Sequence, residues 1–141
     1  MNLDNMYRET ILDHNQIPRN KGSLEDPTAS VGLLNPTCGD QIRLDVKVVD
    51  GQLMDIRFDG QGCAISMASA SMMTEAVKGQ SVAESLAVAR EFKAFLTGTA
   101  PHRNLGDLGA LEGVAQFPSR IKCATLASNA LEQALTQEGM R

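Results

Sequence analysis

The stretch from residue 42 to residue 58 constrains the fold more than any other part of the sequence. Apolar and polar residues alternate over 42–48 and again over 54–58, which is typical of strands that bury one face and expose the other. Asp50-Gly51 lies between the two runs and favours a type I′ turn, because both central positions of that turn need positive φ. A β-hairpin is therefore predicted. Its inward-facing side chains are expected to be Ile42, Leu44, Val46, Val48, Met54, Ile56 and Phe58.

A third strand and several helices are expected around this hairpin. Residues 29–33 alternate in the same way, and Ser81-Val82-Ala83-Glu84 forms a capping-box motif, in which each end side chain is expected to bind the other residue's backbone N–H. Because the predicted strands come before most of the helices along the chain, an α+β fold is favoured. We expect a three-stranded antiparallel sheet packed against helices. The helices are expected at residues 3–14, 64–77, 82–98 and 118–135, with an insert at 99–116 that carries one helical turn near 108–111.

Length and charge exclude several classes of function. A chain of 141 residues is the size of one domain, so residues 1–141 are expected to form a single domain. Thirteen Lys and Arg against 17 Asp and Glu, with no basic run, argue against nucleic-acid binding. No apolar stretch approaches the roughly 18 residues of a membrane span, and the polar N-terminus shows no secretory signal. A soluble, cytoplasmic protein is expected.

The three cysteines are the candidates for chemistry. Three is an odd count, and in a reducing compartment sparse thiols are metal ligands, nucleophiles or inert core residues. Cys38 lies in a turn-forming segment, Cys63 directly precedes a predicted helix, and Cys123 lies in the first two turns of another. Asp40 follows Cys38 by two residues, with Gly39 able to bend between them. Three thiolates and a carboxylate can surround Zn²⁺ or bind iron with sulfide, although the cysteine spacing matches no simple metal motif and leaves three buried, inert thiols as an alternative.

Charged residues near and far from the cysteines complete the set of candidates. Arg120 and Lys122 flank Cys123 and are the natural counter-charges for a negatively charged centre. The two histidines and two of the aspartates occur in polar contexts and are expected to be solvent-exposed. These residues are His14, His102, Asp13 and Asp107.

Three segments of the chain resemble the cysteine motifs of a known family. They are Asn35-Pro36-Thr37-Cys38-Gly39-Asp40, Gly60-Gln61-Gly62-Cys63-Ala64-Ile65-Ser66 and Arg120-Ile121-Lys122-Cys123-Ala124-Thr125-Leu126. They look like the motifs of U-type iron–sulfur cluster assembly proteins, the IscU, SufU and NifU N-terminal family. The chain is most similar to the SufU branch, because Lys122 stands where the IscU branch typically has His and residues 99–116 look like the SufU insert.

The resemblance implies a role in sulfur transfer for iron–sulfur cluster assembly. A SufS-like cysteine desulfurase, dependent on pyridoxal phosphate, would donate persulfide sulfur, and downstream SUF components would receive it. Cys38 would accept the sulfur, and Arg120 would stabilise its thiolate electrostatically. The chain would then be a sulfurtransferase-like partner of the desulfurase rather than a stand-alone enzyme. The zinc ligands implied by the motifs are Cys38, Asp40, Cys63 and Cys123.

Two alternatives to this interpretation stay open at the level of sequence. In the first, the same four residues hold a [2Fe–2S] cluster, and the protein is the scaffold on which that cluster is assembled before transfer to apo-proteins. In the second, zinc only holds the fold together and no sulfur is transferred.

Overall fold

The structure of the protein is a computed structural model that describes residues 3–36, 39–98 and 105–139. Cys38, His102 and the first part of the predicted insert therefore lie outside the described residues. The chain order is α1 (Leu3–Gln16), β1 (Ala29–Asn35), β2 (Asp40–Val49), β3 (Gln52–Gln61), α2 (Ala64–Val77), α3 (Val82–Leu96), a 3₁₀ helix η1 (Gly106–Gln116) and α4 (Pro118–Gly139). None of the described helices is both long and apolar enough to cross a membrane.

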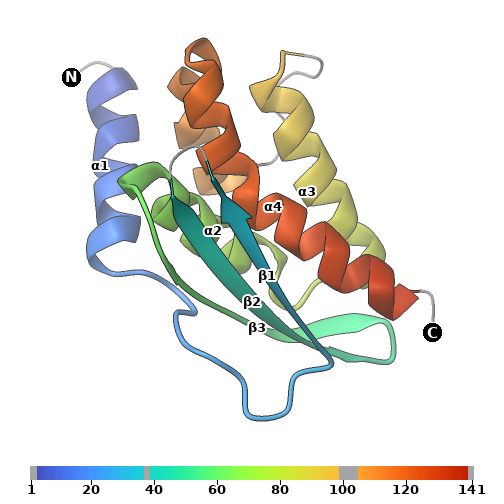
Figure 1. Ribbon diagram of the computed structural model, residues 1–141. Coiled ribbons are helices and arrows are strands. Elements are labelled where there is room, and N and C mark those ends of the chain that lie inside the picture. Colours follow the sequence, from blue (N-terminus) through green and yellow to red (C-terminus); the bar gives the residue numbers. More distant parts are fainter. Residues whose placement is uncertain (1–2, 37–38, 99–104, 140–141) are drawn as a thin grey trace.

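The predicted three-stranded antiparallel sheet and the predicted hairpin are confirmed. The strands lie in the order β1-β2-β3, and Asp50 and Gly51 have φ values of 52° and 76° at the turn between β2 and β3. The helices lie against one face of the sheet, with α2 and α4 directly behind it and α1 and α3 to either side (Figure 1). Two layers of this kind bury one shared apolar core.

A bulge in β3 changes which side chain faces the core. Lys47 pairs with Asp55 and Val48 pairs with Leu53, so that Met54 is an extra residue in its strand. Met54 was predicted to face the core but is 56% exposed, whereas its neighbour Leu53 is fully buried. An inserted residue reverses the alternation of side chains on one side of the bulge, and a period-two pattern does not reveal where such an insertion occurs.

The face of the sheet opposite the helices is also partly covered. Asp45 was predicted to face solvent but is 1% exposed. Its carboxylate accepts hydrogen bonds from the backbone N–H of Leu24 at 3.0 Å and from the hydroxyl of Ser30 at 2.6 Å. The segment between α1 and β1 therefore covers this part of the face, and the buried carboxylate is satisfied by local donors.

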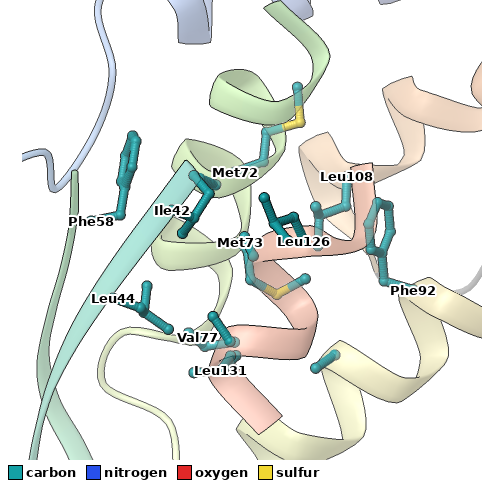
Figure 2. Close-up of a cluster of buried hydrophobic side chains, with 14 of the residues drawn as sticks. Ile42, Leu44, Phe58, Met72, Met73, Val77, Phe92, Leu108, Leu126 and Leu131 are labelled. Carbon is teal, nitrogen blue, oxygen red and sulfur yellow. The ribbon is translucent and has the colours of Figure 1, made fainter. Parts of the chain in front are cut away.

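The core lies between the sheet and the helices (Figure 2). Side chains from the strands meet methionines and leucines from α2 and α4, and α3 and η1 close the far side. The 3₁₀ helix is longer than the single turn predicted at 108–111, and Val114, which lies beyond that turn, belongs to the core together with Leu108 and Leu111. The buried side chains that Figure 2 labels are Ile42, Leu44, Phe58, Met72, Met73, Val77, Phe92, Leu108, Leu126 and Leu131.

The first turns of α2 and α3 are both capped by a side chain. The hydroxyl of Ser81 accepts the backbone N–H of Glu84 at 3.0 Å. The reciprocal half of the predicted capping box differs, since the Glu84 carboxylate accepts a hydrogen bond from the Ser81 hydroxyl at 3.0 Å. At the start of α2 the capping residue is Cys63, whose sulfur accepts the N–H of Ser66. A cysteine thus occupies a position that Ser, Thr, Asp or Asn usually fills.

Candidate metal centre

Three of the four predicted ligands converge at one end of the sheet. Asp40 is the first residue of β2, Cys63 caps α2 and Cys123 lies in the second turn of α4. One potential ligand atom from each lies within 4.8 Å of the other two. Asp40 and Cys123 are buried, and Cys63 is partly exposed. Side chains that are 23 and 60 positions apart in sequence therefore form one group, as the sequence analysis predicted.

The backbone holds the carboxylate of Asp40 against Cys63. Asp40 pairs with Asn35 at the end of the β1–β2 ladder, and its Oδ1 accepts the backbone N–H of Cys63 at 2.9 Å. The thiol of Cys63 lies 3.8 Å from Oδ2. A Cβ at Gly62 would collide with this carboxylate and would lie 2.9 Å from its Cγ. Glycine is required before Cys63 because the acid packs directly on the backbone there.

The start of α2 provides a favourable environment for negative charge at Cys63. The sulfur accepts the backbone N–H of Ser66 at 3.4 Å. Unpaired N–H groups give the first turn of a helix a partial positive charge, which attracts anions. Cys63 and the Asp40 carboxylate both lie at this end of a 14-residue helix.

Cys123 is held from two sides. Its thiol donates to the carbonyl oxygen of Ser119 at 3.7 Å. The side-chain amide of Asn35, which is 6% exposed, donates to its sulfur at 3.9 Å. Asn35 belongs to the first cysteine motif, but this contact could not be predicted from the motif, because its partner is 88 residues away.

The positive charges predicted near the centre lie at the protein surface. Arg120 and Lys122 are both exposed. Arg120 lines a groove of about 690 Å³ that Ala64 and Ile65, the two residues after Cys63, also line. The groove therefore includes the two residues that follow Cys63, while Asp40, Cys63 and Cys123 do not line it. The predicted support of Arg120 for the Cys38 thiolate stays a prediction, since Cys38 lies outside the described residues.

The donor atoms fit a zinc or iron site. Thiolates and a carboxylate are ligands of both metals. Tetrahedral zinc, with Zn–S of about 2.3 Å and Zn–O of about 2.0 Å, places ligand atoms about 3.5–3.8 Å apart. Cys63 Sγ and Asp40 Oδ2 already lie 3.8 Å apart. Shifts of about an ångström would bring the remaining pairs into that range, since all three atoms lie within 4.8 Å of one another.

A second polar cluster contradicts the prediction that His14 is exposed. His14 is fully buried, and its Nδ1 and Nε2 lie 2.8 Å from Ser71 Oγ and 2.8 Å from Asp107 Oδ2. Asp107 is half-exposed, as predicted. Helical periodicity at one end of the chain cannot show that a distant segment will cover it, so the burial of His14 was missed.

A basic side chain already lies beside this second cluster. Glu75, together with His14 and Asp107, could present ligand atoms to a metal, but the guanidinium of Arg19 lies 3.6 Å from the Glu75 carboxylate. A hydrogen bond with Asp13 raises the pKa of Arg19 above its ordinary value, so Arg19 stays charged. We therefore interpret this cluster as a structural connection between α1, α2 and η1.

Comparison with known proteins identifies the family. Residues 6–138 match the NifU-like N-terminal domain. The zinc-dependent sulfurtransferase SufU of Bacillus subtilis (strain 168) is 49% identical over 140 residues, which are 97% of this chain and 94% of that protein. The iron–sulfur cluster assembly scaffold protein IscU of Streptococcus pyogenes serotype M1 is 47% identical, over 94% of this chain and 84% of that protein.

A solved structure agrees with this assignment. The putative iron–sulfur cluster assembly scaffold protein for the SUF system from Fervidobacterium islandicum AW-1 superimposes with a TM-score of 0.86 at 30% identity, over 90% of this chain and 94% of that one. The three-stranded sheet, the converging Asp40, Cys63 and Cys123, and these likenesses agree with one another. The chain belongs to the family of NifU-like N-terminal domains, which includes SufU and IscU proteins.

Proposed function

We propose that this protein accepts persulfide sulfur from a cysteine desulfurase in a zinc-dependent manner and passes it on for iron–sulfur cluster assembly. The observation that carries the proposal is the convergence of Asp40, Cys63 and Cys123 within 4.8 Å. The similarity to the zinc-dependent sulfurtransferase SufU of Bacillus subtilis supports it. Residues 1–141 would act as one domain, in the cytoplasm.

Four residues would hold the metal in this proposal. They are Cys38, Asp40, Cys63 and Cys123, of which Cys38 is assigned from its place two residues before Asp40 in the sequence. Bound zinc supplies positive charge that keeps coordinated thiols deprotonated. The carboxylate of Asp40 is the hardest, least thiophilic ligand of the four, and we expect it to bind zinc least tightly.

Cys38 is the proposed sulfur acceptor. Its thiolate attacks the outer sulfur of the desulfurase persulfide, so that one S–S bond forms at Cys38 while another breaks and returns the desulfurase cysteine as a thiolate. No net oxidation occurs in this exchange. Cys123 is unsuited to the task because it is 1% exposed, whereas an acceptor must be reached by the partner's persulfide. The charge of Arg120 would favour the Cys38 thiolate.

The donor partner is proposed to be a SufS-like desulfurase that uses pyridoxal phosphate, and the acceptors are downstream SUF components. The test is a desulfurase assay with and without this protein, run beside elemental analysis of the purified protein. We expect bound zinc and a faster desulfurase. A protein without zinc, or one that leaves the desulfurase unchanged, would contradict the proposal.

Replacement of Cys38 by Ser tests the choice of acceptor. Mass spectrometry of the wild-type protein after incubation with the desulfurase and cysteine should find one added sulfur on Cys38, and the Cys38→Ser variant should carry none. As the control, wild-type protein incubated with the desulfurase in the absence of cysteine should carry no added sulfur. Persulfide on Cys63 in the Cys38→Ser variant would refute the assignment.

A scaffold role is the second candidate, because the similar Streptococcus pyogenes protein is an IscU scaffold and the same donor atoms suit iron. Anaerobic incubation with iron and sulfide separates the two functions. A coloured protein that transfers a [2Fe–2S] cluster to an apo-acceptor would favour the scaffold. A colourless zinc protein that accelerates the desulfurase favours the sulfur acceptor.

A further inference from the structure

The hydroxyl of Ser66 is buried beside the metal centre without a hydrogen-bond partner. In the part of the chain that the structure describes, only two buried serine hydroxyls lack a partner, those of Ser66 and Ser128. Other buried hydroxyls are satisfied. That of Ser69 donates to the carbonyl of Ala124 at 2.5 Å. An unpaired buried hydroxyl costs free energy in a folded protein, so its position calls for an explanation.

The place of Ser66 in α2 explains why its usual partner is missing. Counting from the capping residue Cys63, Ser66 is the third helical residue. A polar side chain there normally reaches back to the backbone N–H of the capping residue. In this protein the N–H of Cys63 already donates to Asp40 Oδ1 at 2.9 Å. The hydroxyl therefore lacks the donor that it would normally bind, because that N–H is already engaged.

Contacts of α2 on two sides place Ser66 near the proposed centre. Ser69, one turn further along the same face of α2, contacts Ala124, the residue that follows Cys123. On the other side, the backbone N–H of Ser66 lies 3.4 Å from the sulfur of Cys63. The buried hydroxyl thus belongs to a residue whose own backbone N–H contacts the Cys63 sulfur.

We propose that Ser66 is a positioning residue whose hydroxyl donates a hydrogen bond to the Cys63 thiolate when the centre holds its metal. This inference rests on the proposed function. Three thiolates and a carboxylate carry four negative charges, and zinc neutralises two. Hydrogen-bond donors must stabilise the remainder. A change of χ1 between staggered positions is the movement that would bring the hydroxyl to the sulfur.

A second serine whose buried hydroxyl also lacks a hydrogen-bond partner, but which is not part of the proposed centre, provides the control. Ser128 lies on α4, five positions after Cys123, and its buried hydroxyl is also unpaired. Replacement of either serine by Ala removes an unsatisfied hydroxyl from the metal-free protein, so the melting temperature of each metal-free variant should equal or exceed that of the wild type.

The two variants should differ once metal is added. In competition with a chromogenic chelator, Ser66→Ala should bind zinc about 10–100-fold more weakly than wild type, the usual cost of losing a hydrogen bond to a ligand. Ser128→Ala should bind zinc as wild type does. In the cobalt-substituted protein, Ser66→Ala should shift the sulfur-to-cobalt absorption band to longer wavelength, because a thiolate that loses a hydrogen bond gives up its electrons more readily.

The outcomes separate this inference from the proposed function. If wild type binds zinc and Ser66→Ala binds it within twofold, with an unshifted cobalt band, the role of Ser66 is wrong and the proposed function stands. An equal loss of affinity in Ser128→Ala would also overturn the role, because the effect would then be one of packing. A wild-type protein that binds neither zinc nor cobalt would overturn both.

Discussion

Asp40 has an environment that suits a metal ligand better than a structural acid. Its side chain is fully buried, and its donors in the described part of the chain are the backbone N–H and the thiol of Cys63. Buried carboxylates are normally paired with a basic group or bound to a metal, because an isolated buried charge is costly. Asp45, also on β2, contrasts with it, since backbone, hydroxyl and guanidinium donors satisfy its carboxylate.

These two aspartates should respond to replacement in opposite ways. Asp40→Ala should bind zinc at least about tenfold more weakly, because a proposed ligand is lost. The metal-free protein should keep most of its stability, because removal of a buried carboxylate that has no basic partner among the described residues offsets the loss of its hydrogen bond with Cys63. Asp45→Ala should leave zinc affinity unchanged but lower the free energy of unfolding by about 1–3 kcal/mol, because the donors around it lose their partner. Chelator competition and urea unfolding measure the two effects. Wild-type metal retention and sulfur transfer in Asp40→Ala would show that Asp40 is not a ligand.

The sequence indicated which side chains could converge where residue chemistry is distinctive, and it missed contacts and burial that depend on packing. Asp40, Cys63 and Cys123 stood out because thiols are rare in this chain and glycines surround two of the motifs. The roles of His14 and Asn35 were missed, because each depends on a partner more than 50 positions away. Residue type indicates what a side chain can do, whereas burial depends on which segment covers it.

The β3–α2 junction is the element that aligns the centre. Gly62 lies between the last residue of β3 and the capping Cys63. Its backbone does not have the positive φ that marks several other glycines in this protein. Alanine would therefore be tolerated by the backbone itself, but its Cβ would collide with the carboxylate of Asp40. The requirement for glycine comes from the close approach of the Asp40 carboxylate, and not from backbone strain.

Replacement of this glycine should weaken metal binding more than it weakens the fold. In Gly62→Ala the Asp40 carboxylate must move, and we expect zinc affinity to fall about tenfold or more. Gly32→Ala is the matched control, since a Cβ there meets nothing within 4 Å and φ is not positive; its zinc affinity should equal that of the wild type. Chelator competition on both variants is the measurement. Equal zinc affinities of Gly62→Ala and Gly32→Ala would contradict the proposed contact between position 62 and the Asp40 carboxylate.

Elements were predicted reliably where local sequence determines them. The turn at Asp50-Gly51 and the cap at Ser81 follow from the conformations and hydrogen bonds that these residues favour. The bulge at Met54 and the length of η1 were not predicted. Both depend on the fit between a segment and the core beneath it, and a period of two or of 3.6 residues carries no information on that fit.

At the scale of the whole molecule, His14 connects three elements. Its ring joins α1 to Ser71 of α2 and to Asp107 of η1. Each ring nitrogen has a partner, so the buried imidazole is fully satisfied. This connection holds the later part of the predicted insert, residues 106–116, against the body of the protein.

Removal of the imidazole should therefore destabilise the whole domain. We expect His14→Ala to lower the free energy of unfolding by about 2–4 kcal/mol, because it opens a cavity and leaves the Ser71 hydroxyl without one partner. Asp13→Ala, which breaks the exposed ion pair with Arg19, should cost about 1 kcal/mol or less. Urea unfolding of both variants checks this. Equal losses of unfolding free energy in the two variants would mean that His14 contributes no more to stability than an exposed ion pair does.

Metal binding should stabilise the fold as a whole, because the ligands come from β2, α2 and α4. A ligand present at about 1,000 times its dissociation constant adds about 4 kcal/mol to the free energy of unfolding. For a domain of this size that corresponds to a rise of roughly 8–16 °C in melting temperature. Differential scanning calorimetry with zinc and with a chelator measures the shift, and identical melting temperatures would contradict a centre that joins these elements.

X-ray absorption at the zinc edge of the loaded protein tests the central claim most directly. The account predicts about three sulfur atoms near 2.3 Å and one oxygen near 2.0 Å around the zinc, supplied by the three cysteines and Asp40. The oxygen contribution should be lost or altered in Asp40→Ala, and one sulfur should disappear in Cys63→Ser. A shell of oxygen and nitrogen alone, or one that Cys63→Ser leaves unchanged, would contradict the account.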